Sequence, residues 1–233
     1  MASLVQDQSK ARLKSVEKRE LDEYQLAAWF DIQRQEIEAS YLESDSPYRH
    51  SGWGSTPQRW RLGRELILEA VTNSGSFLDI GCANGLLLEC LSQWAREREI
   101  HLTPYGIDIS PKLIELARLR LPAFGFNLTV ANGLHWQPTN RFDYVHTLLE
   151  YVPDQLQEDY LKRLLNQTLA EAGRLIVSSY SNRTQNRQPI DVVAYLQQHG
   201  FQVAGSTTSL DQDGWVLTRV AWVNSAIASS SMR

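Results

Sequence analysis

A glycine-bounded turn after an apolar segment is the first feature of this sequence that could bind a ligand. Residues 77–85 read FLDIGCANG, and a helix-like run of leucines follows them. Because Gly81 and Gly85 carry no Cβ, the backbone can approach a ligand closely, and the N–H groups of a helix start lie nearby. Asp108 ends the next apolar segment, where a carboxylate can accept both hydroxyls of a ribose. The pattern predicts a site for a nucleotide-like molecule.

Two ligand classes fit this turn, a dinucleotide and an adenosyl cofactor. The glycines are spaced Gly-x-x-x-Gly rather than Gly-x-Gly-x-x-Gly, and Asp79 lies inside the preceding strand. A pyrophosphate requires the third glycine and an exposed helix N-terminus, whereas a ligand without phosphate does not. The spacing therefore favours the adenosyl cofactor.

Further polar residues follow the later apolar segments. His146 ends the fourth one, at the edge where open α/β sheets bind ligands, and a neutral imidazole there could accept a proton from an acceptor. His146 is therefore a candidate general base or a pocket-lining residue. Glu150 and Tyr180 are candidate substrate-binding residues. The run SNRTQNRQ after Tyr180 is expected to be a solvated loop, with contact to the substrate as the alternative. Cys82 has no neighbouring base in the sequence, which argues against a nucleophilic thiol.

The elements that would position these residues alternate between strand-like and helical patterns. Apolar segments of strand length are separated by amphipathic runs, which predicts a parallel sheet covered by helices on both faces. Two final segments flank a hairpin-like connection at 210–214, so the sheet is expected to end in an antiparallel pair. The seven expected strands are 76–80, 102–109, 126–130, 142–147, 174–180, 201–209 and 215–223. The predicted fold is a three-layer, doubly wound α/β fold with a mostly parallel seven-stranded sheet.

The N-terminal part of the chain differs in composition from the rest. Residues 1–23 are polar, and the first dozen are expected to be mobile. An apolar helix face follows, and Thr56-Pro57 predicts a helix start, with that helix running to about Val71. The apolar face consists of Leu26, Trp29, Phe30, Ile37 and Tyr41. The expected organisation is an N-terminal helical arm or lid (1–55), a ligand-binding domain (56–223) and a disordered tail (224–233).

An ordered series of segments over residues 56–223 resembles the class I S-adenosylmethionine-dependent methyltransferases. FLDIGCANG resembles the first motif of that family, and GIDIS, which contains Asp108, resembles the ribose-binding second motif. VANGLHW, FDYVHTLLEYVP, EAGRLIVSSY and the closing GFQV and GWVLTRVAWV segments follow in the order of the family. Two positions depart from its pattern, since Ala83 replaces a central glycine and Asn132 replaces an acidic residue.

The resemblance implies that S-adenosylmethionine is the cofactor and that a methyl group moves to an O or N atom of a small molecule. It places Asp79 near the amino-acid end of the cofactor and Asp108 on the ribose. Tyr48 and Trp53 could cap the substrate, and an arginine could bind the cofactor's carboxylate. The implied cofactor-binding residues are Asp79, Gly81, Cys82, Ala83, Gly85, Asp108, Ile109, Asn132, Gly133 and Leu134.

Composition excludes several other classes. A net charge of −4 gives no global positive field for nucleic acid, and the motifs of DNA methyltransferases are absent. No long apolar run or signal peptide occurs, so a cytoplasmic protein without membrane contact is expected. The 2 cysteines lack zinc-ligand spacing, so no metal site is predicted. Two alternatives remain open: a catalytically silent cofactor-binding or partner module and, less favoured, a nicotinamide-dependent oxidoreductase. No oligomeric state is predicted.

Overall fold

The computed structural model describes residues 21–44, 46–50 and 56–225. The chain divides into two compact units, residues 1–33 and residues 34–233. The larger unit contains every strand of the described part. The expected mobile N-terminus and most of the expected disordered tail lie outside the described residues, and the domain boundary expected at residue 55 stays a prediction.

The larger unit is built on a seven-stranded sheet with the order β3-β2-β1-β4-β5-β7-β6. Strand β1 pairs in parallel with β2 and with β4, whereas β7 pairs antiparallel with both β5 and β6. The strands are β1 Gly75–Ile80, β2 Leu102–Asp108, β3 Leu128–Val130, β4 Phe142–Leu148, β5 Leu169–Tyr180, β6 Val203–Leu210 and β7 Val216–Asn224. The predicted doubly wound fold with a closing antiparallel hairpin is confirmed.

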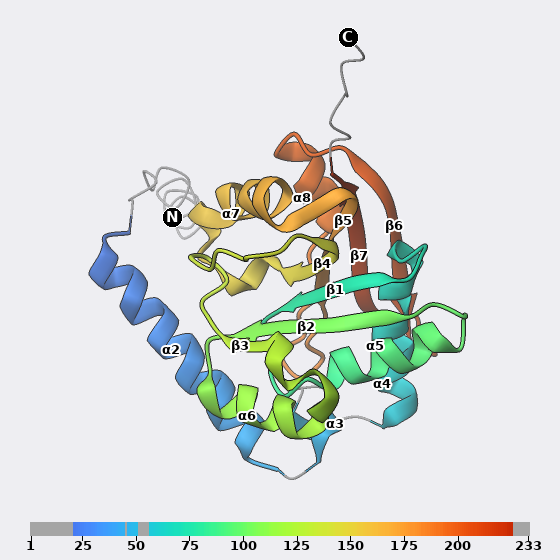
Figure 1. Cartoon of the computed structure of the whole chain (residues 1–233), viewed down its shortest axis with the longest axis horizontal. Coiled ribbons are helices and arrows are strands. Elements are labelled where there is room, and N and C mark those ends of the chain that lie inside the picture. The colour runs from blue at the N-terminus through green and yellow to red at the C-terminus, as the bar shows by residue number, and fades with distance from the viewer. Residues whose placement is uncertain (1–20, 45, 51–55, 226–233) are drawn as a thin grey trace, which may run out of the picture. The chain divides into compact units, whose positions relative to one another are not determined.

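Helices cover both faces of this sheet, with α5 and α6 on one side and α7 and α8 on the other (Figure 1). The α-helices are α2 Glu23–Leu42, α3 Pro47–His50, α4 Pro57–Arg64, α5 Leu86–Arg96, α6 Pro111–Arg120, α7 Gln157–Arg163 and α8 Val192–Gln198. Shorter turns are η2 Glu65–Ala70, η3 Pro122–Asn127, η4 Leu149–Tyr151, η5 Asp154–Leu156 and the π-helical η6 Leu164–Thr168. Val145, Leu175 and Ile176 of the central strands are completely buried, as expected for strands covered on both faces.

Side-chain caps start α4 and α6, where Thr or Ser precedes Pro. Thr56 Oγ1 accepts a hydrogen bond from the Arg59 N–H at 3.3 Å and begins α4. Ser110 Oγ does the same for the Leu113 N–H at 3.2 Å and begins α6. These contacts satisfy N–H groups that lack an intrahelical partner.

Several element boundaries differ from the sequence-based expectation, and three of the differences arise from local helical turns. The third strand begins at Leu128 rather than Phe126, because residues 122–127 form a 3₁₀ turn that leaves the Phe126 ring exposed to solvent. The helix before β5 widens into a π turn and ends at Thr168, so β5 begins five residues before the expected Arg174. The helix from Pro57 changes to a 3₁₀ helix after Arg64.

Candidate functional site

The turn between β1 and α5 follows the carboxyl end of β1 and is held by the neighbouring strand. The N–H groups of Gly81 and Cys82 both donate to the Ile107 carbonyl of β2, at 2.8 and 3.0 Å. Gly81 and Gly85 have φ values of 76° and 75°, a left-handed conformation that glycine adopts without strain. A Cβ at Gly81 would also collide with the Tyr151 ring. This glycine is therefore required both by its backbone conformation and by its close neighbour.

Asp108 ends β2 beside this turn, and its side chain is buried, 5% exposed. Its carboxylate accepts the N–H of Ala83 at 3.0 Å and the N–H of Ser110 at 2.8 Å. Burial raises the pKa of Asp108 to about 6, although the two backbone hydrogen bonds oppose the shift. An ionised carboxylate has about four acceptor positions, so it can accept two further hydroxyl donors.

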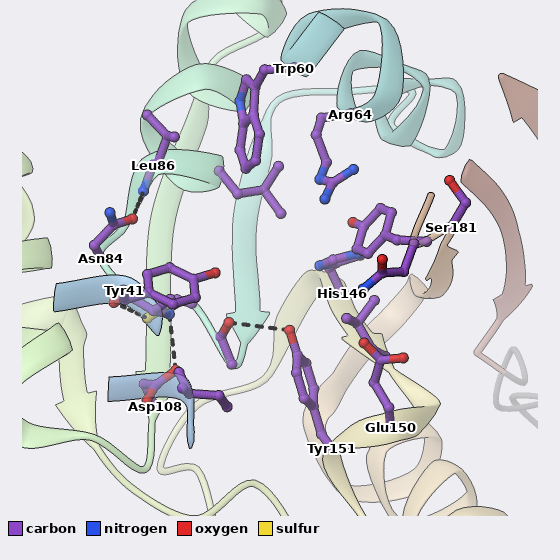
Figure 2. Close-up of a pocket in the computed structure, with 18 of the residues that line it drawn as sticks. Tyr41, Trp60, Arg64, Asn84, Leu86, Asp108, His146, Glu150, Tyr151 and Ser181 are labelled. Atoms are coloured by element: carbon purple, nitrogen blue, oxygen red, sulfur yellow. Dashed lines mark hydrogen bonds between the residues drawn. The ribbon is translucent and has the colours of Figure 1, made fainter. Parts of the chain in front are cut away.

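The turn and Asp108 face a cavity of about 320 Å³. Figure 2 shows Asp108 and Tyr41 on one side of it, Glu150 and Ser181 on the other, and Arg64 between them. Its walls come from the β1–α5 turn, the end of β2, the end of α2, helix α4, and the segments that follow β4 and β5. Lining side chains include Tyr41, Arg59, Trp60, Arg64, Asp108, His146, Glu150, Tyr151, Tyr180, Arg183 and Arg187.

A buried hydrogen-bonded chain crosses the central strands behind the turn. Asp79 of β1 and His146 of β4 are register partners in the sheet, and both are at most 2% exposed. His146 Nδ1 lies 2.7 Å from Asp79 Oδ1, and Nε2 lies 2.9 Å from Ser178 Oγ of β5. When Nδ1–H donates to Asp79, Nε2 accepts from the Ser178 hydroxyl. Both ring nitrogens of His146 therefore have hydrogen-bond partners.

Arg64 places a buried guanidinium in the cavity wall. The side chain lies at the end of α4, 4% exposed. Its Cζ atom is 3.4 Å from the centroid of the Tyr180 ring and 4.8 Å from that of Trp60. Burial lowers the pKa of Arg64, and nearby tyrosines oppose the shift. Because the ring faces attract the cation, this arrangement holds a planar, bidentate donor at the cavity.

The segment after β4 contributes an acid and a phenol. Glu150 remains exposed to solvent, but desolvation by the surrounding cavity wall raises its pKa, while Arg187 and Arg64 act to lower it. Burial also raises the pKa of Tyr151 far above its ordinary value, so its hydroxyl stays neutral and donates to the Gly81 carbonyl at 3.3 Å. Tyr151 therefore both packs against the turn and fixes the peptide that begins it.

The second half of α2 is joined to the Asp108 segment. Glu38 of this helix is buried, and its carboxylate accepts the Ser110 hydroxyl at 2.8 Å and the Lys112 ammonium at 2.9 Å. The hydrogen bond from Lys112 is the main reason that the pKa of Glu38 is lowered. Ser110 donates its backbone N–H to Asp108 at the same time.

Two negative findings apply only to the part of the chain that the structure describes. None of its helices is long and apolar enough to cross a membrane. Within the same residues, no three His, Cys, Asp or Glu side chains gather in a group that could hold a metal ion.

A family model described as a methyltransferase domain matches residues 53–212, more than half of the chain. The chain belongs to this methyltransferase domain family. A curated relative, the trans-aconitate 2-methyltransferase of Methylobacterium radiotolerans, is 30% identical over 128 residues. That alignment covers 54% of this methyltransferase domain protein and 46% of the relative, so the match spans about half of the relative's length.

Solved structures of methyltransferases share the fold. The N-methyltransferase NodS from Bradyrhizobium japonicum, in complex with S-adenosylhomocysteine, superposes with a TM-score of 0.63 at 19% identity and covers 83% of this chain and 98% of its own. A Burkholderia thailandensis 1,6-didemethyltoxoflavin-N1-methyltransferase gives 0.62 at 13% identity, covering 86% and 90%. These likenesses confirm that the methyltransferase domain has the class I, Rossmann-like fold of S-adenosylmethionine-dependent enzymes.

The methyltransferase domain brings together seven of the residues predicted from sequence. The cavity lining contains Gly81, Cys82, Ala83, Asp108, His146, Glu150 and Tyr180. Asp79 lies behind this lining and reaches it through His146, whereas Gly85 and Ile109 adjoin the turn and Asp108. Their roles in binding and catalysis stay predictions.

Other predicted residues lie elsewhere in the methyltransferase domain. Residues 132–134 (Asn132, Gly133 and Leu134) follow β3 outside the cavity lining, but the Ala131 N–H donates to the Asp108 carbonyl at 2.9 Å and keeps them near Asp108. Asn132 Oδ1 accepts the Leu134 N–H at 2.9 Å. Tyr48 packs edge-on against Trp60, with ring centroids 6.3 Å apart, and does not line the cavity. Trp53 lies outside the described residues.

Sequence reasoning missed Arg64. Trp60 and Arg64 are four residues apart on α4 and therefore share its buried face, which is the signal that could have identified Arg64. Tyr41, expected only on the apolar face of the arm, lines the cavity, and the run after β5, for which the sequence favours a solvated loop over substrate contact, contributes Ser181, Asn182, Arg183, Thr184 and Arg187 to it. Charged residues in such a loop carry no periodic pattern, so only the fold reveals which way they face.

Proposed function

We propose that this protein transfers a methyl group from S-adenosylmethionine to an oxygen or nitrogen atom of a small molecule. The observation that carries the proposal is the placement of Asp108 and the Gly81 turn on one cavity. A buried carboxylate with acceptor positions left matches the two hydroxyls of a ribose. The relatives that share the family or the fold include methyltransferases named for small molecules.

We infer that residues in the cavity and beside it would hold an adenosyl cofactor. Asp108 would accept the ribose hydroxyls, and Asn132, with one acceptor position left on its amide oxygen, would lie toward the adenine. At the other end, Gly81 would offer its backbone and Arg64 would bind the amino-acid carboxylate in a bidentate manner. The bound cofactor supplies an electrophilic methyl group on a positively charged sulfur. The chain's own task is to hold the acceptor atom about 3 Å from that methyl and to exclude water.

The environment of His146 supports a positioning role more than the general-base role predicted from sequence. Both ring nitrogens are engaged inside the sheet, so accepting a proton from an acceptor would require Nε2 to give up Ser178. The same contacts fix the buried Asp79 carboxylate, which would lie near the amino-acid end of the cofactor. We therefore infer that His146 acts through Asp79.

Two substitutions at His146 distinguish these roles. His146→Ala should weaken binding of S-adenosylhomocysteine by roughly tenfold or more, because it leaves a buried charge without its donor. His146→Asn can keep a donor toward Asp79 and should restore most of that affinity. Isothermal calorimetry provides the measurement. A general base would give the opposite pattern: both variants would bind the product normally and would lose turnover.

The raised pKa of Asp108 predicts a pH dependence of cofactor binding. Ribose hydroxyls donate to the ionised carboxylate, so protonation removes acceptor capacity. Affinity for S-adenosylhomocysteine should therefore be constant above the pKa of about 6 and should decrease as the pH falls through that value. Calorimetry between pH 5 and pH 8, in a buffer series of constant ionic strength, checks this. An affinity that does not change across that range would contradict the assignment of Asp108 to the ribose.

The proposed function is tested by ligand binding and by turnover. Purified protein should release heat with S-adenosylmethionine and with S-adenosylhomocysteine, and none with NADH. Incubation with S-adenosylmethionine and a panel of small hydroxyl, carboxylate and amine compounds should release S-adenosylhomocysteine with at least one of them. No heat with either adenosyl compound would overturn the proposal, and binding without turnover across the panel would favour a silent cofactor-binding module.

A further inference from the structure

Four arginines line the cavity from two segments that are far apart in the sequence. Arg59 and Arg64 belong to α4, whereas Arg183 and Arg187 belong to the segment that follows β5. The acidic residues in the same lining are Asp108 and Glu150. If the proposed function holds, Asp108 serves the ribose and Arg64 serves the single carboxylate of the cofactor. Three arginines at the cavity then exceed what the cofactor needs.

Arg59 and Arg183 are oriented by one shared carboxylate. Asp211 Oδ2 lies 3.6 Å from Arg59 Nη1 and 3.3 Å from Arg183 Nη2. Its other oxygen accepts the N–H groups of Asp213 and Trp215, both at 3.0 Å, in the turn between β6 and β7. Asp211 does not line the cavity, so it holds the two guanidinium groups from behind. Arg183 Nη2 is also 2.9 Å from Asp213 Oδ2, and both carboxylate contacts of Arg183 use this one atom, so its Nε and Nη1 can donate to a ligand.

Arg183 and Arg187 are set at the two ends of one closed turn. The backbone groups of Asn182 and Arg187 exchange two hydrogen bonds of 2.8 Å, and Asn182 Oδ1 accepts the Gln185 N–H at 3.0 Å. The Arg183 guanidinium also lies 5.6 Å from the centroid of the Trp215 ring. The turn therefore presents two cations on a fixed backbone at the cavity wall, which reduces the ordering cost of binding an anion.

We propose that the methyl acceptor is an organic carboxylate, bound through its carboxylate by Arg183 and Arg187, with Arg59 adding to the local positive charge. The proposal deepens the proposed function and rests on it, because it assigns the nucleoside end and Arg64 to the cofactor. Guanidinium groups match the planar carboxylate with paired N–H donors, and several together discriminate strongly against a neutral analogue.

The first test is ligand selectivity at fixed cofactor occupancy. Protein saturated with S-adenosylhomocysteine is titrated by calorimetry with succinate, citrate, benzoate and cinnamate, and in parallel with the corresponding amides. At least one carboxylate should bind roughly tenfold or more tightly than its amide, and its binding should weaken as salt increases. The proposal is overturned if no carboxylate exceeds its amide, or if phosphate esters of similar size bind more tightly than every carboxylate.

The second test uses matched arginine variants. Arg183→Gln and Arg187→Gln should each weaken binding of the selected carboxylate by roughly tenfold while affinity for S-adenosylhomocysteine stays at the wild-type value. Arg96→Gln is the control, because Arg96 is exposed on α5 outside the cavity and donates through Nε to the Ser92 carbonyl of its own helix. Equal carboxylate affinity in all three variants would overturn the assignment. Failure of the wild-type protein to bind S-adenosylhomocysteine would instead refute the proposed function.

Discussion

Asp108→Ala is expected to abolish measurable binding of S-adenosylhomocysteine by this protein. The substitution removes a buried carboxylate that would accept both ribose hydroxyls, and such a charge-assisted contact contributes on the order of 2–4 kcal/mol, roughly 30-fold to 1,000-fold in affinity. Isothermal calorimetry measures the effect directly, and thermal unfolding of the variant shows whether it is folded.

A matched control is needed because Asp108 also holds two backbone N–H groups of the turn. Asp143 provides it, since its carboxylate accepts the Ser76 N–H at 2.7 Å at the opposite end of β1, away from the cavity. Asp143→Ala should lower the melting temperature and leave ligand affinity unchanged. If Asp108→Ala is folded and binds the ligand as tightly as Asp143→Ala does, the ribose assignment is wrong.

Gly81→Ala is expected to destabilise the protein and to prevent ligand binding. A left-handed conformation costs a non-glycine residue roughly 1–2 kcal/mol, and the added methyl would also collide with the Tyr151 ring. The free energy of unfolding should therefore fall by about 2–5 kcal/mol, since overpacking adds about 1–3 kcal/mol to the strain. Chemical denaturation measures this loss.

Two comparisons separate the collision from the backbone strain. Gly200 has a φ of 78°, and nothing lies within 4 Å of the place that a Cβ would occupy there, so Gly200→Ala should show only the strain. In a Tyr151→Ala background, Gly81→Ala should lower the free energy of unfolding only as much as Gly200→Ala does. A double-mutant cycle measures this difference. If Gly81→Ala lowers the free energy of unfolding no more than Gly200→Ala does in the wild-type background, the Tyr151 ring does not prevent a side chain at residue 81.

The sequence was sufficient for the sheet because its strands are buried on both faces. A continuous apolar run such as residues 142–147 indicates a strand that is buried on both faces. The alternation of such runs with helical patterns indicates that the strands are parallel. Prediction failed where local geometry rather than burial decides the structure. The ring of Phe126 is apolar but exposed, because Pro122 and Gly125 lie in a 3₁₀ turn that delays the strand.

The candidate site could be predicted only in the half formed by the β1–α5 turn and Asp108. Gly81, Gly85 and Asp108 are recognisable because a tight turn and a strand end require particular residue types at fixed positions. The opposite half depends on side chains whose directions are set by contacts between distant segments. Arg183, for example, is oriented by Asp211 across the final hairpin, and no spacing within the sequence indicates that contact.

If Asp108 binds a nucleoside as proposed, the bond between Glu38 and Ser110 couples that binding to the attachment of the turn of α2 that contains Glu38. Ser110 donates its hydroxyl to Glu38 and its backbone N–H to Asp108, so the same residue contacts the helix and the Asp108 carboxylate. Thermodynamic coupling of two equilibria is reciprocal. Whatever free energy a bound nucleoside gains from a correctly placed Ser110 is also added to the anchoring of this helical turn, and detachment of the turn would cost the nucleoside the same amount.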